Sequence, residues 1–513
     1  MSFLHWLKWK SPQNPSAHPT YEKLTGTISP SLAANIAELS ALFSLAPDLV
    51  IRHLVIQSTG DEAALVYMNG LSDKNSINNN VIRSLQTGTS GGSSGSAPTV
   101  TIGYIMKLTR WEDIEQALFQ GYSILFTEGL TEVQTFDTQG WPQRSIEDPQ
   151  IEASLKGAHQ GFVETGTQNI AMIRRYIPNR ELKIREITVG RRGRTTVSIL
   201  YLADVAHPEV LKELEDRIRR LDVDAILNTG ELEGFIEDNP YSPFPQFLST
   251  ERPDAAASQI LQGRFAVVVD RSPSVLIGPT TFTSFFQSLD DYSTRWLLAT
   301  FIRLLRFVGF LVAAFLPALY IAAISFNYEV IPIKLILSIG ESRERVPFPP
   351  IVEALLMEIT LEMLREAGIR LPSPIGQTVG IVGGIVIGQA AVQAGIVSNV
   401  MVIVVAATAI ASFIIPNYDM ASAIRLIRFP MMIIASMFGI VGIVIGLMTL
   451  IAHLISLESL GTPYGSPLAP MRFADWKDTF IRVPLWKMTK RPVSARPVQD
   501  KRLGPNHPRG DGK

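Results

Sequence analysis

The stretch that decides the fold is Pro374–Gly395, "PIGQTVGIVGGIVIGQAAVQAG". It carries no charged residue, and it is long enough to cross a bilayer, since a membrane-spanning helix needs about 20 mostly apolar residues. Within it, glycine recurs at every fourth position, at Gly376, Gly380, Gly384 and Gly388, and three glutamines share the segment. These glycines leave one side of a membrane helix with little side-chain volume, and this pattern predicts close contact with another helix.

The glycines share one face, because residues four apart on a helix lie above one another. In lipid, small residues at this spacing let two helix backbones approach closely, and helices there gain stability from packing. Ala391 extends the same groove. We therefore predict a helix-packing face made of Gly376, Gly380, Gly384, Gly388 and Gly395.

The amide side chains lie on a separate stripe of the same helix. An uncharged polar group in hydrocarbon is costly unless it finds a partner or water. Two interpretations stay open: the amides bond across helices inside one subunit, or copies of the helix surround a narrow pore whose apolar rings at Val382 and Ile385 act as a gate. The pore-lining candidates are Gln377, Thr378, Val382, Ile385, Gln389 and Gln393.

The absence of Asp, Glu, Lys and Arg from Pro374–Gly395 bears on the mechanism. A proton-coupled pump usually keeps an ionisable residue inside the membrane. The segment therefore favours passive conduction over active coupling.

An acidic amphipathic helix is expected just upstream, over residues 350–368. Pro350 begins it, and its acidic residues Glu358, Glu362 and Glu366 recur at intervals of four. It is too charged to cross a membrane as a lipid-facing helix, so we expect it to lie in the interface or to re-enter the membrane. The acidic stripe is either a solvated face or a cation-attracting ring at a pore mouth.

The hydrophobicity of the chain is concentrated in its second half. The 513 residues have a mean hydropathy of +0.20, 18% charged residues, a net charge of −1 and no cysteine. Long apolar runs predict a transmembrane domain over residues 291–460, with four spans at about 296–326, 375–395, 399–415 and 429–456.

Basic residues predict the orientation. Arg295, Arg303 and Arg306 flank the first span, and residues 471–513 carry eleven Lys or Arg against four Asp. Basic flanks remain on the cytoplasmic side, so both termini are expected there, with residues 461–513 as a basic cytoplasmic tail. Trp476 and Trp486 are expected to hold this tail against an anionic leaflet.

The first part of the chain reads as a soluble α+β or α/β region. After a flexible lead over residues 1–30, the order helix, hairpin, helix occurs twice, which predicts subdomains over 31–145 and 146–290. The expected strands include "LVIRHLVIQ" with "EAALVYMNG", and "LKIREITVG" with "TTVSILYL". Helices are expected over 31–45, 75–85, 148–176 and 208–221.

No enzymatic function is predicted. The Gly/Ser-rich stretch "TGTSGGSSGSAPT" contains G-x-S-x-G, but no strand runs into the serine and no helix leaves it, so it is interpreted as a linker. No phosphate loop, dinucleotide loop or metal-binding histidine pattern is present, so neither a cofactor nor a metal is expected.

The stretch "FPPIVEALLMEITLEMLREAGIRLPSPIGQTVGIVGGIVIGQAAVQAGIVS", with "YIAAISFNYEVIP" before it, resembles the A subunits of spore germinant receptors, the GerA spore germination protein family. The resemblance implies a multi-pass protein of the inner membrane of the bacterial endospore. It implies a transporter-like B subunit and a lipoprotein C subunit as partners. It also implies a homo-oligomer, expected to be a pentamer, that passes cations when nutrient binds.

Three functional hypotheses follow. The first is a subunit of a ligand-gated cation channel that triggers germination. The second is a non-conducting signalling scaffold of the receptor complex. The third is a secondary transporter, which is disfavoured because no charged midplane residue and no inverted repeat is visible.

Overall fold

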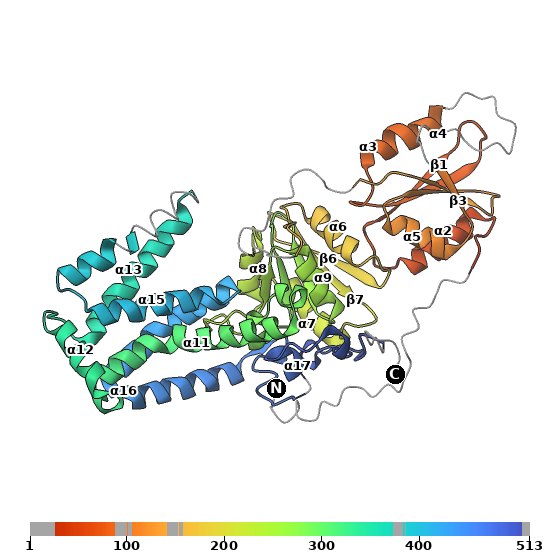
Figure 1. Ribbon diagram of the computed structural model, residues 1–513. Helices are drawn as coiled ribbons and strands as arrows, with labels where there is room; N and C mark the ends of the chain where they lie inside the picture. The colour runs from red at the N-terminus through yellow and green to blue at the C-terminus, as the bar shows by residue number, and fades with distance from the viewer. Residues whose placement is uncertain are drawn as a thin grey trace.

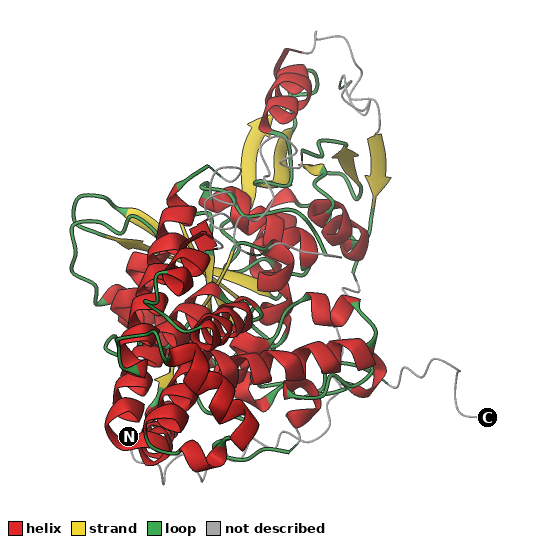
Figure 2. Ribbon diagram, turned by 60° about the vertical axis from the view of Figure 1, so that its left-hand side comes forward, coloured by secondary structure: helices red, strands yellow, loops and turns green. Residues whose placement is uncertain are grey.

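A computed structural model describes residues 26–87, 100, 105–140, 152, 157–372, 383–384, 386–473 and 475–504. These form two mixed α/β subdomains followed by a region of long helices (Figure 1). Strands are confined to the two subdomains, apart from the short pair β11 and β12 that follows the last long helix (Figure 2).

The first subdomain is a five-stranded sheet with helices on both faces. Its strands stand in the order β1-β2-β4-β5-β3 and are all antiparallel. Helices α2 and α5 cover one face, and the continuous helical stretch α3, η1 and α4 covers the other. The bounds are α2 Leu32–Leu42, β1 Leu49–Val55, β2 Glu62–Met68, α3 Lys74–Ser76, η1 Ile77–Ile82, α4 Arg83–Thr87, β3 Ile105–Leu108, α5 Trp111–Phe119, β4 Ser123–Thr127 and β5 Val133–Phe136.

The second subdomain has the same plan. Its sheet order is β6-β7-β9-β10-β8, which is the order of the first sheet with each strand number raised by five. Alternate side chains of its strands pack against α7 and α8 on one face and α6 and α9 on the other. The bounds are α6 Gly166–Tyr176, β6 Leu182–Val189, β7 Thr195–Leu202, α7 Pro208–Arg219, α8 Thr229–Ile236, β8 Leu248–Thr250, α9 Pro253–Leu261, β9 Phe265–Val269, β10 Val275–Gly278, η2 Phe282–Phe286 and α10 Asp290–Ser293.

Both predicted hairpins are confirmed, as β1–β2 and β6–β7. The helix expected over 148–176 begins only at Gly166, because residues 157–165 form irregular backbone that includes strand-like cap geometry at Thr165. The remainder of that prediction, apart from residue 152, and the Gly/Ser stretch from residue 88 to 99 lie outside the described residues.

A buried ion pair fixes the two subdomains to each other. Arg174 on α6 forms two hydrogen bonds with Asp48, at 2.9 Å from Nε and 3.1 Å from Nη2, and both side chains are buried. Beside it, Gly70 adopts a φ of +86°, and a Cβ there would come within 2.7 Å of Ala171 Cβ. Only glycine permits this approach of the two subdomains.

The helical region begins with α11, Trp296–Ser325, which runs away from the second subdomain (Figure 1). Short helices lie at its far end, and α13 then leaves the bundle at an angle (Figure 1). The bounds are η3 Tyr328–Val330, α12 Ile333–Arg343, α13 Pro350–Arg370, a helix described over 383–384 and 386–393, α15 Asn399–Phe413 and α16 Tyr418–Ser456.

The last long helix, α16, is a helical hairpin. Gly439 has a φ of 61° and a ψ of −141°, a conformation that is essentially restricted to glycine. Beyond it the chain returns alongside itself, so that a Cβ on Gly442 would meet Ile434 O at 2.5 Å and one on Gly446 would meet Met431 Sδ at 2.5 Å. At the other end, Ser242 of the second subdomain contacts His453 at 2.9 Å.

The predicted single span over 429–456 is therefore corrected to two antiparallel helices, 418–438 and 440–456. Hydropathy alone did not reveal the reversal, because apolar residues continue through it. Among the described residues, α11 and α16 are long and apolar enough to cross a membrane. Helix α15 matches the span predicted over 399–415 but has 15 residues, and most of the span predicted over 375–395 lies outside the described residues.

The tail after α16 folds back onto the second subdomain rather than extending from it. It contains β11 Glu458–Ser459, β12 Thr462–Pro463, α17 Trp476–Thr479, η4 Leu485–Lys487 and η5 Val493–Ala495. Val498 N donates to Val205 O at 2.8 Å, and Arg491 Nε donates to Leu261 O at 2.9 Å. The basic side chain of Arg491 therefore serves the internal structure.

Candidate functional site

The acidic face of α13 meets two arginines of α16. Glu358 and Arg428 form an ion pair in which each side chain is only 2% exposed. Arg428 Nε also donates to Ala313 O of α11 at 2.8 Å. This pair thus joins three helices at a point where neither charge reaches solvent.

A second set of charges extends the contact toward α15. Glu362 lies 3.3 Å from Arg425 and 3.4 Å from Arg365. Arg365 donates to Ser412 Oγ at 3.3 Å, and its guanidinium lies over the Phe413 ring at 4.9 Å. One carboxylate between two arginines leaves this cluster with an excess of positive charge.

Glu353 plays a third structural part. Its carboxylate is fully buried, pairs with Arg343 at 2.8 Å and accepts a hydrogen bond from Ser398 N at 3.0 Å. That amide lies at the start of α15, where backbone N–H groups lack helical partners and an anion is stabilising. Glu353 therefore caps α15.

The predicted acidic stripe is thus divided. The solvated-face interpretation is wrong for Glu358, because its carboxylate is buried against Arg428. Glu366 is exposed and pairs with Arg370 at 2.6 Å, and Glu362 is partly exposed. Whether Glu362 or Glu366 contributes to a ring stays a prediction.

In the helix that ends at residue 393, Gly388 is buried, whereas Gly384 and the two described glutamines are exposed. Gln389 and Gln393 are exposed. Gly384 is exposed and a Cβ there would meet nothing within 4 Å, whereas Gly388 is buried against Val402 of α15. The other predicted pore-lining and packing residues lie outside the described residues: Gly376, Gln377, Thr378, Gly380, Val382 and Ile385.

Gly395 has a different role from the packing face predicted for it. Its φ is +67°, and a Cβ there would lie 2.9 Å from Arg345 O. It terminates the helix in the left-handed conformation that glycine favours, so the turn rather than a helix–helix groove requires it.

Arg425 and Arg428 were missed as functional residues. The predicted span began at residue 429 and left them outside as flanking charges, whereas α16 begins at Tyr418 and carries them inside the bundle. Arg425 and Arg428 are three residues apart, and the glutamates of α13 are four residues apart. Each spacing places charges on one helix face, and this pattern could have indicated that the two faces pair.

A separate charge network lies where the second subdomain meets α11. Asp291 Oδ2 accepts from Arg303 Nη2 at 3.1 Å and from Arg306 Nη1 at 2.8 Å. Asp478 of the tail pairs with Arg303 at 3.0 Å and accepts from Tyr292 Oη at 2.8 Å. Arg303 and Arg306, two of the three arginines predicted as membrane flanks, therefore join α10, α11 and the tail.

The carboxylates of Glu233, Glu237 and Asp419 lie close enough for their charges to interact. Burial, followed by the charges of Glu237 and Asp419, raises the pKa of Glu233 on α8 from 4.5 to about 8. Asp419 lies in the first turn of α16, so the pKa of Glu233 depends on the contact between the second subdomain and the helical region.

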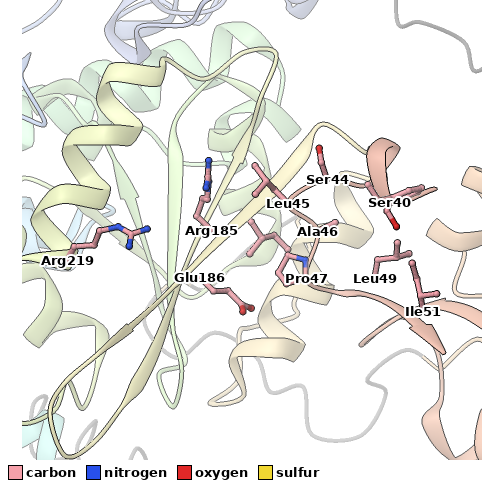
Figure 3. A pocket seen from close by; sticks show the side chains of 12 residues that line it. Ser40, Ser44, Leu45, Ala46, Pro47, Leu49, Ile51, Arg185, Glu186 and Arg219 are labelled. Carbon is pink, nitrogen blue, oxygen red and sulfur yellow. The ribbon is translucent and has the colours of Figure 1, made fainter. Parts of the chain in front are cut away.

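The soluble part contains a cavity of about 490 Å³ between the subdomains. Figure 3 shows Leu45, Ala46 and Pro47 of the first subdomain beside Arg185 and Glu186 of β6. One wall is thus apolar and the other charged, which suits a ligand with both kinds of group. A second cavity, of about 270 Å³, lies between the second subdomain and the start of α16.

Comparison with known proteins places these features in a family. A family model described as Bacillus/Clostridium GerA spore germination protein matches residues 37–494. Spore germination protein KA of Bacillus subtilis (strain 168) is 43% identical over 474 residues, which cover 91% of this chain and 87% of that protein. Spore germination protein GerLA of Bacillus cereus is 39% identical, over 87% of this chain and 92% of that protein.

Two further matches extend the comparison. Spore germination protein B1 of Bacillus subtilis (strain 168) is 38% identical over 92% of this chain and 98% of that protein. The crystal structure of the N-terminal domain of the A subunit of the Bacillus megaterium spore germinant receptor GerK3 covers 50% of this chain and 98% of that chain, at 28% identity and a TM-score of 0.39.

The relatives and the two long apolar helices associate this protein with a membrane. The family model covers most of the chain, and the relatives align over almost its whole length. The chain belongs to the GerA family of spore germination proteins.

Proposed function

We propose that this protein is the A subunit of a spore germinant receptor, and that copies of it assemble into a cation channel whose opening by nutrient triggers germination. The proposal includes a B and a C subunit as partners, no enzymatic activity, and a multi-pass position in the inner membrane of the spore. The match to the GerA family and the relatives named as spore germination proteins support the role in germination.

One observation carries the channel proposal. Gln389 and Gln393 are exposed on a helix whose exposed neighbours, Val386 and Ile387, are apolar. An amide that faces lipid has neither water nor a hydrogen-bond partner, so this face is unfavourable in an isolated subunit. A neighbouring copy or a water-filled path on that side removes the cost.

The path of the helices supports an even number of membrane crossings. The N-terminal end of α11 and the tail after α16 meet in the network of Asp291, Arg303 and Asp478, so the helical region begins and ends at the same side. With basic flanks at that end, both termini lie on the cytoplasmic side in our proposal.

Cysteine accessibility tests the proposal, because the natural chain contains no cysteine. Gln389→Cys and Gln393→Cys are introduced into the full receptor in liposomes, with Ile403→Cys, a 66% exposed position on the apolar α15, as the control. A water-soluble thiol reagent should modify positions 389 and 393 and reduce potassium flux, and it should spare position 403. Unmodified thiols at 389 and 393, with no flux in the presence of nutrient, would refute the channel.

The non-conducting scaffold is the second candidate. It is supported by the ion pairs among α10, α11 and the tail, because these pairs link the second subdomain to the helical region. It predicts that reconstituted receptors pass no current with nutrient, while Asp291→Asn still abolishes the germination response.

A further inference from the structure

The segment Met471–Lys487, in which residue 474 lies outside the described residues, is held against the first turns of α11. Arg482 N donates to Thr300 Oγ1 at 3.1 Å, and the ring centroids of Phe480 and Phe307 are 4.8 Å apart. A helix rises about 1.5 Å per residue, so these contacts span about 10 Å of α11. We call this segment the collar.

The same turns of α11 expose apolar side chains on their outer side. Leu297 and Phe301 are 64% and 63% exposed, and Leu304 and Leu305 are also exposed. A helix that displays such residues faces lipid there, but Arg303 and Arg306 are buried in ion pairs with Asp291 of α10, so these turns lie at the membrane interface and the hydrocarbon core begins beyond them. The collar therefore lies at the depth of the membrane interface.

The collar itself exposes large apolar side chains. Met471, Phe473, Ile481 and Leu485 are 60%, 68%, 51% and 51% exposed. Trp476 lies between Phe473 and Phe480, at centroid distances of 5.0 and 5.7 Å, and is half-buried. Trp476, which was expected to contact the leaflet, thus packs against the exposed Phe473.

The charged side chains that the collar exposes are lysines. Lys477 and Lys487 are exposed. The carboxylates turn inward: Asp478 pairs with Arg303 and Tyr292, and Asp475 accepts from Val493 N at 3.4 Å. Burial also raises the pKa of Asp475. The outer surface is consequently apolar and cationic.

We propose that the collar is a lipid-binding surface that inserts its apolar side chains into the leaflet on the side of the soluble region and binds anionic headgroups through Lys477 and Lys487. Apolar residues next to lysines are the composition of interfacial segments. The bilayer is the favoured partner because the collar packs against Thr300 and Phe307 of α11, on turns of that helix that also expose apolar side chains. This proposal does not depend on ion conduction.

Site-specific fluorescence in the full-length protein tests the collar. Phe473→Cys and Leu485→Cys each supply a single thiol for an environment-sensitive dye, and Val55→Cys, at a 54% exposed position in the first subdomain, is the control. The proteins are reconstituted into phosphatidylcholine vesicles with or without phosphatidylglycerol. Dyes at 473 and 485 should emit at shorter wavelength and be quenched by lipids labelled near the headgroup, whereas the dye at 55 should not.

The anionic requirement is tested with Lys477→Gln and Lys487→Gln, against Lys212→Gln on α7, which is exposed and lies outside the collar. Each neutralised lysine should lower the ratio of inserted to water-exposed dye about five-fold in anionic vesicles. Equal insertion in neutral vesicles overturns the headgroup part of the proposal. Water-like emission at 473 and 485 in both lipids overturns it entirely and points to a protein partner for this surface.

Discussion

The ion pair between Glu358 and Arg428 allows a quantitative test of how the helical region is held together. Replacing one partner of a buried pair leaves the other charge uncompensated and costs about 3–5 kcal/mol, whereas replacing both by apolar residues is often neutral or stabilising. Both side chains here are 2% exposed, which places the pair in this class. We therefore expect Glu358→Leu to destabilise the protein by about 3–5 kcal/mol.

The double variant Glu358→Leu with Arg428→Met should recover most of this loss. Arg428 Nε also donates to Ala313 O, and that bond is lost in the double variant, so we expect a residual cost of about 1 kcal/mol. Arg428→Met alone should also cost about 3–5 kcal/mol, so the coupling energy from the mutant cycle is about 5–9 kcal/mol. Thermal unfolding of the full-length protein in detergent, followed by intrinsic fluorescence, supplies the four free energies.

A matched control is available on the same helix. Glu366 pairs with Arg370 at 2.6 Å, but its side chain is 61% exposed, so Glu366→Leu should change the free energy of unfolding by less than about 1 kcal/mol. If Glu358→Leu and Glu366→Leu behave alike, or if Arg428→Met brings no recovery, the charges are not coupled inside the bundle and α13 does not pack against α16 through this pair.

Three further predictions address other parts of the molecule. Gly439→Ala places a Cβ within 2.7 Å of Asn327 Oδ1 at a φ of 61°, so it should lower the melting temperature strongly, while Gly384→Ala in an open helical position should raise stability by up to about 1 kcal/mol. Because the pKa of Glu233 is raised from 4.5 to about 8, the folded state binds this proton more tightly than the unfolded state does. The melting temperature should therefore fall as pH rises from about 5 to about 8, and Glu233→Gln should flatten this part of the curve of melting temperature against pH. Asp291→Asn leaves two buried arginines without their shared carboxylate, so limited proteolysis should cut the tail faster than in the natural protein, and an unchanged cleavage rate would contradict the network.

Local patterns predicted the soluble region well. The β1–β2 and β6–β7 hairpins follow directly from alternating apolar residues with polar turns between them. The shared strand order of the two sheets was visible only as a weak repeat of helix and hairpin, because strands β3–β5 and β8–β10 are short, and β3 and β8 pair with β5 and β10, which do not follow them directly in the chain.

The helical region was harder to predict. Hydropathy located α11 but did not show the reversal at Gly439, since the glycines at 439, 442 and 446 look like any small residues in an apolar run. It also left Arg428 outside the span predicted over 429–456, because its partner Glu358 is 70 residues away in the chain. Long-range pairing of charges is invisible to a window that slides along one helix.

The shared carboxylate of Asp291 restricts how α11 can move. Arg303 and Arg306 leave the helix on one side, and both reach the same oxygen atom, at 3.1 and 2.8 Å. A turn of α11 about its own axis would break both contacts together, whereas a tilt that pivots near Asp291 would preserve them. A conformational change of the second subdomain that reaches α11 through Asp291 would therefore tilt the helix and displace its distant end, where Asn327 contacts the bend of α16.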